Sequence, residues 1–237
     1  MDFTRALTFP FDDDEWLKKL GIGVIISLAG VLLSFLVLIP LLAMAVLFAG
    51  WRYEIMKRVK NNDPVPLPDW DFGALFSKGL TLFGAQLVYQ IPTIIFACIA
   101  SVIWLLPLLG ANSNNSNAAG ALAGVSGIII ICCSCIIVLY AIVAAIVYFG
   151  GLIRFLDNEQ FSTFFQFGDN IAIVRNNAGD FGMVLLYLIL AGAIASVASS
   201  ITFGLGGLLT TTFMSYFAGH ILGQLATKLG SPATPMV

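Results

Sequence analysis

Two sets of polar side chains at helical spacing stand out in an otherwise apolar chain. The first recurs every four residues near the carboxyl terminus and includes the only histidine of the sequence: Thr212, Tyr216, His220 and Gln224. The second lies in the first half of the chain: Gln86, Tyr89, Gln90 and Thr93. Side chains three or four residues apart share one face of an α-helix, so each set forms a polar stripe. In a membrane, such a stripe can line the path of a substrate.

Both stripes also have a purely structural explanation. Neutral polar side chains of membrane helices hydrogen-bond between helices, and each such bond is worth about 1 kcal/mol. A single histidine without a nearby second ligand or carboxylate more often packs than relays protons or binds a metal. We therefore prefer packing for both stripes, and the stripe with His220 is the better candidate for chemistry.

The sequence offers no stronger site. Cys132 and Cys135 share one helical face, a spacing that suggests metal or redox chemistry, but both lie in an apolar run without a second cysteine pair. Thiolates are disfavoured in lipid, and cysteine is a common small residue of buried helices, so we interpret this pair as packing. We identify no catalytic residue, no cofactor-binding residue and no metal ligand, and we expect no enzymatic activity and no cofactor.

Small residues at four-residue spacing predict close contacts between helices. They form two sets: Gly192, Ser196 and Ser200, and Gly219 with Gly223. Small side chains at this spacing allow two helix backbones to touch, and we expect packing to be their main role.

The elements that carry these residues are membrane helices. The chain is 59% hydrophobic and 10% charged, with a mean hydropathy of +0.97, far from the composition of soluble domains. Residues 79–153 contain no Asp, Glu, Lys or Arg, which is enough chain for two crossings of about 20 residues around a polar break at residues 112–117. A net charge of −2 without a basic stripe excludes nucleic acid as a partner. The sequence predicts an all-α, polytopic transmembrane bundle.

We expect one membrane domain over residues 1–237, built from three helical hairpins with interfacial amphipathic helices. The hairpin units cover about residues 10–60, 68–157 and 161–228, and interfacial helices are expected at residues 51–59 and within 157–180. The first apolar run, residues 20–51, either crosses once as a kinked helix or turns near Pro40. The turn gives six crossings, which we favour, and the single helix gives five.

The charge distribution predicts the orientation. With six crossings, all eleven Lys and Arg residues fall on one side of the membrane, which is expected to be the cytoplasmic side. With five crossings, Arg5, Lys18 and Lys19 lie outside. In both topologies the Asn-rich loop, residues 110–121, lies outside the cell membrane and the carboxyl terminus is cytoplasmic.

A short repeat closes the apolar runs. Residues 48–50, 149–151 and 217–219 each begin with Phe and end with Gly, and each leads into amphipathic sequence. This similarity supports three units of related architecture.

Two stretches carry a resemblance to a known family. Residues 9–23, from Phe9 through the acidic cluster to Gly23, and residues 67–79, which begin Leu-Pro-Asp-Trp, resemble the domain-of-unknown-function family numbered four thousand and thirteen. The resemblance implies a prokaryotic integral membrane protein and brings no activity or functional residues.

Two functions fit these observations. The predicted membrane interior lacks the acids and bases that ion-coupled transporters and pumps use, so we favour a structural, assembly or interaction subunit of a membrane complex. Its partners would be the lipid bilayer and other membrane proteins or further copies of itself. The alternative is an uncoupled carrier for a hydrophobic or neutral small molecule or lipid.

Overall fold

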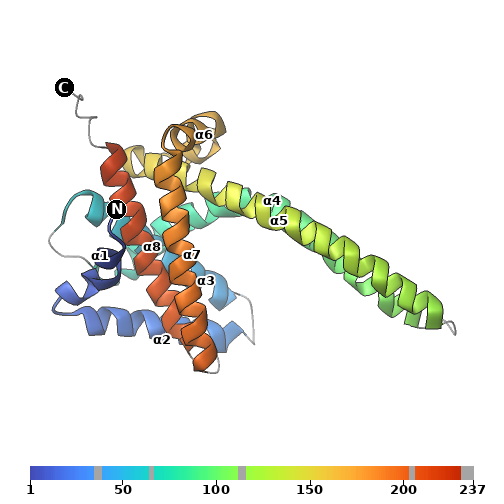
Figure 1. Ribbon diagram of the computed structural model, residues 1–237. Coiled ribbons are helices and arrows are strands. Elements are labelled where there is room, and N and C mark those ends of the chain that lie inside the picture. The colour runs from blue at the N-terminus through green and yellow to red at the C-terminus, as the bar shows by residue number, and fades with distance from the viewer. Residues whose placement is uncertain (35–38, 64–66, 112–115, 203–205, 231–237) are drawn as a thin grey trace. The chain divides into compact units, whose positions relative to one another are not determined.

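The protein is all-helical throughout the part of the chain that the computed structural model describes, residues 1–34, 39–63, 67–111, 116–202 and 206–230 (Figure 1). The helices, in chain order, are α1 (Phe3–Thr8), η1 (Phe9–Asp12), α2 (Trp16–Ser34), α3 (Ile39–Lys60), α4 (Phe72–Ala111), α5 (Ser116–Asn158), η2 (Phe161–Phe165), α6 (Phe167–Asn176), α7 (Ala178–Ile201) and α8 (Gly206–Gly230). The predicted all-α fold class is confirmed. Among the described residues, five helices, α2, α3, α4, α5 and α7, are long and apolar enough to cross a membrane.

The chain divides into two compact units. The first contains Met1–Ala85 and Phe149–Val237, and the second contains Gln86–Tyr148, the distal parts of α4 and α5. Every Asp, Glu, Lys and Arg of the sequence belongs to the first unit. The two units therefore pose different physical problems, because only the first must place charged groups.

The first apolar run forms two helices, α2 and α3, which pack against each other. The predicted turn near Pro40 falls partly on residues 35–38, which lie outside the described residues. Both helices are longer than the apolar run alone suggests, because α2 begins at Trp16 and α3 continues to Lys60. Residues 51–59, expected as a separate interfacial helix, are thus the last turns of α3, since no helix breaker separates them from the apolar part.

Helix α3 is the centre of the first unit. Its buried side chains include Trp51, Tyr53, Ile55 and Met56, all at most 1% exposed. On one side it meets α4, where a Cβ atom at Gly50 would collide with the Leu75 carbonyl and one at Gly79 with the Val46 carbonyl. The backbones of α3 and α4 are therefore in direct contact, which a side chain at either glycine would prevent.

On another side, α3 meets α8 in the same manner. A Cβ atom at Gly219 would lie 2.9 Å from the Arg52 carbonyl oxygen, and one at Gly223 would lie 2.7 Å from Cβ of Val59. These two glycines therefore pack within the chain, against α3. The repeat ending at Gly50 and Gly219 thus places a glycine at a helix contact in both copies.

The third copy of the repeat follows the same rule with a different neighbour. A Cβ atom at Gly150 would lie 2.8 Å from the backbone carbonyl oxygen of Asn170, and one at Gly151 would lie 3.0 Å from the side-chain nitrogen of Asn170. This contact seats α6 on the last turns of α5. Helix α6 occupies the segment expected to form an interfacial helix.

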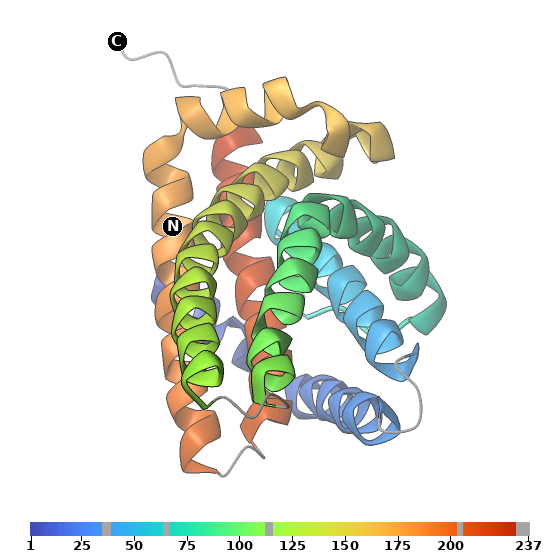
Figure 2. The ribbon, with the colours of Figure 1, turned by 90° about the vertical axis from the view of Figure 1, so that its right-hand side faces the viewer.

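Helices α7 and α8 lie side by side (Figures 1 and 2). The contact face of α7 includes Ala191 and Ala195, which are 0% and 7% exposed. The neighbouring small residues behave differently: Ser196 and Ser200 are exposed, and a Cβ atom at Gly192 would only just reach Met214 at 4.0 Å. The predicted packing set of Gly192, Ser196 and Ser200 therefore lies one residue away from the face that α7 presents to α8.

The contact between α3 and α4 gives a direct test. Gly50→Ala adds a methyl group that no rotamer can move away from the Leu75 carbonyl, so we expect a loss of at least about 3 kcal/mol of unfolding free energy. Gly84→Ala is the control, because its Cβ atom meets nothing within 4 Å; it should stabilise α4 by about 0.5–1 kcal/mol. Thermal unfolding in detergent measures both. Equal midpoints for the two variants would show that backbone contact does not hold α3 to α4.

Candidate functional site

The polar stripe of α8 faces the amino-terminal segment of the same chain. Phe9 of η1 stacks on the His220 ring at 4.3 Å between centroids and meets Tyr216 edge-on at 5.7 Å. Gln224 accepts a hydrogen bond from the Asp2 backbone N–H at 2.6 Å and donates one to the Asp2 carbonyl at 3.1 Å. Its side-chain nitrogen also lies 2.9 Å from Nδ1 of His220. These contacts join α1 and η1 to α8.

The remaining member of this stripe, Thr212, faces α2. Its Cγ2 would lie 2.7 Å from a Cβ atom at Gly23, so Gly23 makes room for it. Thr212 is 2% exposed, and its hydroxyl has no hydrogen-bond partner in the described part of the chain. All four polar residues of the stripe therefore point into the first unit.

The other predicted stripe belongs to the second unit. Tyr89 is 6% exposed and packs edge-on against Tyr148 at 5.7 Å, and its carbonyl accepts a hydrogen bond from the Tyr140 hydroxyl at 2.9 Å. Gln86, Gln90 and Thr93 are half-buried. Tyr89 therefore contributes to the contact between α4 and α5, and the two predicted stripes fall in different units.

The Cys132 and Cys135 thiols are free and exposed. Because both side chains are exposed, this pair does not form within this chain the buried packing element that the sequence suggested. The flanking residues Ile131 and Ile136 are exposed and apolar, an environment in which small thiols can face lipid.

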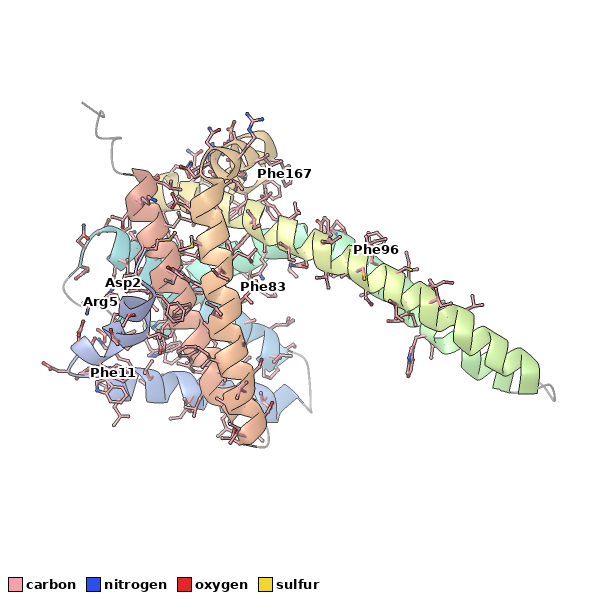
Figure 3. The ribbon with its side chains drawn as sticks, in the orientation of Figure 1. Asp2, Arg5, Phe11, Phe83, Phe96 and Phe167 are labelled. Carbon is pink, nitrogen blue, oxygen red and sulfur yellow. The ribbon has the colours of Figure 1, made fainter. Side chains whose placement is uncertain are left out.

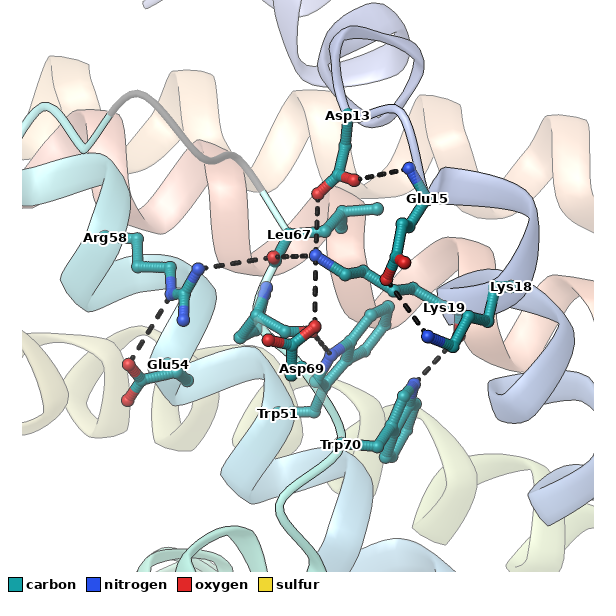
Figure 4. Close-up of polar contacts among 11 residues, drawn as sticks. Asp13, Glu15, Lys18, Lys19, Trp51, Glu54, Arg58, Leu67, Asp69 and Trp70 are labelled. Carbon is teal, nitrogen blue, oxygen red and sulfur yellow. Dashed lines mark hydrogen bonds and ion pairs between the residues drawn. The ribbon is translucent and has the colours of Figure 1, made fainter.

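A buried lysine organises the start of α2 (Figure 4). Lys19 is 6% exposed, and its ammonium group lies 2.8 Å from the Asp13 carboxylate, 3.2 Å from the Asp69 carboxylate and 3.0 Å from the Leu67 carbonyl oxygen. Burial raises the pKa of Asp13, but the hydrogen bonds from Lys19 and from the Glu15 N–H outweigh burial and hold that pKa below its ordinary value. Two carboxylates and a carbonyl thus satisfy one buried ammonium group.

Two tryptophans fix the segment that follows α3 (Figure 4). Trp51 and Trp70 stack with their ring centroids 4.9 Å apart. The Trp51 indole N–H donates to the Pro68 carbonyl at 3.3 Å, and the Trp70 indole N–H donates to the Lys19 carbonyl at 2.8 Å. Each residue of the Leu-Pro-Asp-Trp stretch therefore makes a contact with α2 or α3, which gives this stretch a structural role.

A second charged cluster closes the end of α5. Glu159 accepts hydrogen bonds from the Tyr53 hydroxyl at 3.1 Å, the Lys57 ammonium at 3.1 Å and the Lys78 ammonium at 2.5 Å. Hydrogen bonds from Lys78 and Lys57 lower the pKa of Glu159 to about 2. Its backbone has φ of 51°, a left-handed conformation that non-glycine residues rarely adopt. The carboxylate thus joins α3, α4 and α5 at a strained position.

The stripe residue His220 also lines a cavity of about 280 Å³ in the first unit. The other lining residues are Arg5, Phe9, Arg58, Val59, Asn62 and Asp63. The sequence pattern drew attention to His220 but not to Arg5 or Arg58. These arginines belong to α1 and α3, so their proximity to His220 depends on the tertiary fold.

Together these features define an integral, multi-pass membrane protein with an all-helical fold and charged clusters at the ends of its helices. The sequence model of the family described as "Protein of unknown function (DUF4013)" matches residues 32–204, and the chain belongs to this family. The Leu-Pro-Asp-Trp stretch lies inside the matched range, and residues 9–23 precede it. Comparisons with curated proteins and with solved structures gave no significant match.

The Lys19 cluster generates a prediction with an adjacent control. Lys19→Met removes a buried cation and leaves the Asp13 carboxylate and the Leu67 carbonyl without it, so we expect a loss of about 3–5 kcal/mol of unfolding free energy. Lys18→Met removes only an exposed pair with Glu15 and should change stability by less than about 1 kcal/mol. Unfolding midpoints in detergent compare the two. If the two variants have the same unfolding midpoint, the buried pair does not position the start of α2.

The Glu159 cluster predicts a pH dependence. Because the pKa of Glu159 is lowered from 4.5 to about 2, its stabilising effect is complete above pH 4.5 and is lost as the pH falls towards 2. Glu159→Gln should therefore lower the thermal midpoint at pH 7, and its difference from the native protein should shrink below pH 4.5. The exposed residue Asp14, changed to Asn, serves as the control. A difference that stays constant from pH 7 to pH 3 would contradict this role of the carboxylate.

Proposed function

We propose that the protein is a non-catalytic structural, assembly or interaction subunit of a membrane complex. The observation that carries this proposal is the length of α5. Its membrane span, Gly124–Asn158, has 35 residues, and the uncharged part of it, residues 124–153, forms a straight helix about 45 Å long. The hydrocarbon core is about 30 Å thick, so this uncharged part would have to tilt by about 48° to lie wholly within it. Membrane helices usually tilt by up to about 40°, and the surplus apolar turns favour cover by another protein.

The exposure of this hairpin supports the same proposal. Only 6% of the most apolar 18-residue window of α4, and of that of α5, is buried within the chain. Gly120 and Gly124 have the small-xxx-small spacing, and a Cβ atom at either would meet nothing within 4 Å. In the set of Gly192, Ser196 and Ser200, the two serines are exposed, and the Ser200 hydroxyl donates to the Ser196 carbonyl of its own helix at 2.9 Å. Both sets allow the close approach of a further helix.

The polar candidates of the sequence fit a role without catalysis. His220 and Gln224 contact Asp2 and Phe9, and Tyr89 contacts α5, so these side chains contribute to packing within the chain. We propose that the partners are the lipid bilayer together with another membrane protein or a second copy of this chain, and that nucleic acid is not a partner. The positive-inside rule supports a cytoplasmic carboxyl terminus and an external Asn-rich loop at residues 110–121.

The alternative is an uncoupled carrier for a hydrophobic or neutral small molecule or lipid. It draws support from an apolar recess of about 340 Å³ within the second unit. Ala100, Ser101, Trp104, Leu105 and Ile130 line this recess. A recess of this kind could hold part of an acyl chain or a small apolar molecule.

Photo-crosslinking tests the subunit proposal. A benzophenone amino acid replaces Leu139 of α5 and, in a separate variant, Ile25 of α2; the two residues are 66% and 65% exposed. Irradiation of native membranes should join position 139 to a protein, because the surplus length of α5 needs protein cover, and position 25 should yield mainly lipid adducts. Electrophoresis and mass spectrometry identify the adducts.

The outcomes separate the two functions. A protein adduct at position 139, whether to another protein or to a second copy, supports the subunit. Lipid adducts alone at both positions would contradict the subunit and leave the carrier as the better explanation of the recess.

A further inference from the structure

The cavity beside His220 brings together groups from four parts of the first unit. Arg5 comes from α1, Phe9 from η1, and Arg58 with Val59 from the end of α3. Asn62 and Asp63 follow α3, and His220 closes the cavity from α8. Figure 3 shows Arg5 on α1, the short helix that begins after Asp2. A cavity lined by elements so far apart in sequence is built by the fold rather than by one loop.

Two arginines line this cavity, and each has N–H donors beyond those that its contacts use. Arg5 forms an ion pair with Asp12 at 2.5 Å, and both side chains are about half exposed. Arg58 donates to the Leu67 carbonyl at 3.3 Å, while its Nε lies 3.7 Å from Glu54, beyond hydrogen-bond distance. That Nε is buried without a hydrogen-bond partner in the described part of the chain. A guanidinium has five N–H donors, and because the Arg58 Nε is buried next to Glu54, the donors that remain for a ligand are on the terminal nitrogens of the two arginines.

The turn after α3 is shaped to border the cavity. Asn62 has φ of 54°, a left-handed conformation that asparagine tolerates better than most residues. Its backbone N–H donates to the Val59 carbonyl at 3.1 Å and that of Asp63 donates to the Arg58 carbonyl at 3.0 Å. This tight turn holds Asn62 and Asp63 next to Arg58. A space of 280 Å³ corresponds to roughly nine water molecules, more than one phosphate group requires.

The charge balance of the lining selects the ligand. Among the lining residues, Arg5 and Arg58 contribute two positive charges and Asp63 one negative charge, and the neighbouring walls of Phe9 and Val59 are apolar. Asp12 and Glu54, which lie beside the two arginines, are not part of the lining. Paired guanidinium groups match the oxygens of a phosphate through parallel N–H to oxygen bonds. The Asp63 carboxylate and the Asn62 side chain can accept hydrogen bonds from hydroxyl groups next to that phosphate.

We propose that this cavity binds a phosphate-bearing anion, with Arg5 and Arg58 holding the phosphate oxygens and Asn62 and Asp63 facing its neighbouring hydroxyl groups. The binding joins α1 to the end of α3. The ligand is either the headgroup of an anionic phospholipid or a soluble phosphate. The headgroup is a natural source, because Arg58 lies in the last turn of a membrane-length helix, where basic residues meet lipid phosphates. The site does not depend on the subunit proposal.

Binding is measured on the full chain by its thermal midpoint under two sets of conditions. In detergent, inorganic phosphate is titrated against chloride at equal ionic strength. In nanodiscs, phosphatidylcholine alone is compared with phosphatidylcholine containing phosphatidylglycerol. If the thermal midpoint rises only with phosphatidylglycerol, the ligand is the lipid headgroup. If it rises only with inorganic phosphate, the ligand is soluble. If it rises with both, the site recognises the phosphate group itself.

Variants show whether the effect arises in this cavity. Arg5→Gln and Arg58→Gln should each weaken the apparent affinity by about tenfold or more, since each removes charge-assisted hydrogen bonds. Arg5→Lys keeps the charge but loses the planar guanidinium, so its apparent affinity should lie between those of the native protein and Arg5→Gln. Arg175→Gln removes an exposed charge of α6 outside the cavity and should leave the affinity unchanged.

Arg5 provides the decisive variant, because its half-exposed side chain can be changed without disturbing the Leu67 carbonyl that Arg58 holds. No rise in midpoint with either probe overturns the proposal. An equal rise in Arg5→Gln and Arg175→Gln also overturns it, since the effect would then come from general screening of surface charge.

Discussion

The direct contact of helix backbones at α3 is the constraint on which the first unit depends. In lipid, helices gain little from hydrophobic expulsion, so they associate through close van der Waals contact. Gly50 and Gly79 provide that contact between α3 and α4, and Gly219 and Gly223 provide it between α3 and α8. Because α3 is enclosed on both of these sides, its large side chains, such as Trp51 and Ile55, are fully buried. The other helices of the unit take their positions from α3.

Charged clusters fix the chain where the glycine contacts end. Lys19 holds the start of α2 to the segment before α4, and Glu159 holds the end of α5 to α3 and α4. A buried ion pair adds little net stability compared with an apolar pair of the same shape, but it penalises any arrangement that leaves one charge alone. The clusters therefore specify which helix ends meet, while the glycine contacts supply the packing between the spans.

Much of the fold follows from the sequence, because long uncharged runs predict membrane helices directly. The ends of these helices do not, since α3 continues from Gly50 into charged sequence without a helix breaker. Spacing also fails to identify the contact face of α7, because Ala191 and Ala195 repeat with the same period as Gly192 and Ser196 and all are small. The candidate site is harder still: His220 is conspicuous as the only histidine, but Arg5 and Arg58 join it only through tertiary structure.

The two units divide the physical tasks of the chain. The first unit contains every charged residue and joins its amino-terminal segment to α8 through Gln224, so its polar groups serve its own assembly. The second unit has no charge, and its helices bury little of their surface within the chain. A phosphate between Arg5 and Arg58 would add a link from α1 to α3 beside the existing link from α1 to α8. Ligand binding would thus stiffen the unit that anchors the hairpin, while the hairpin supplies the surface for a partner.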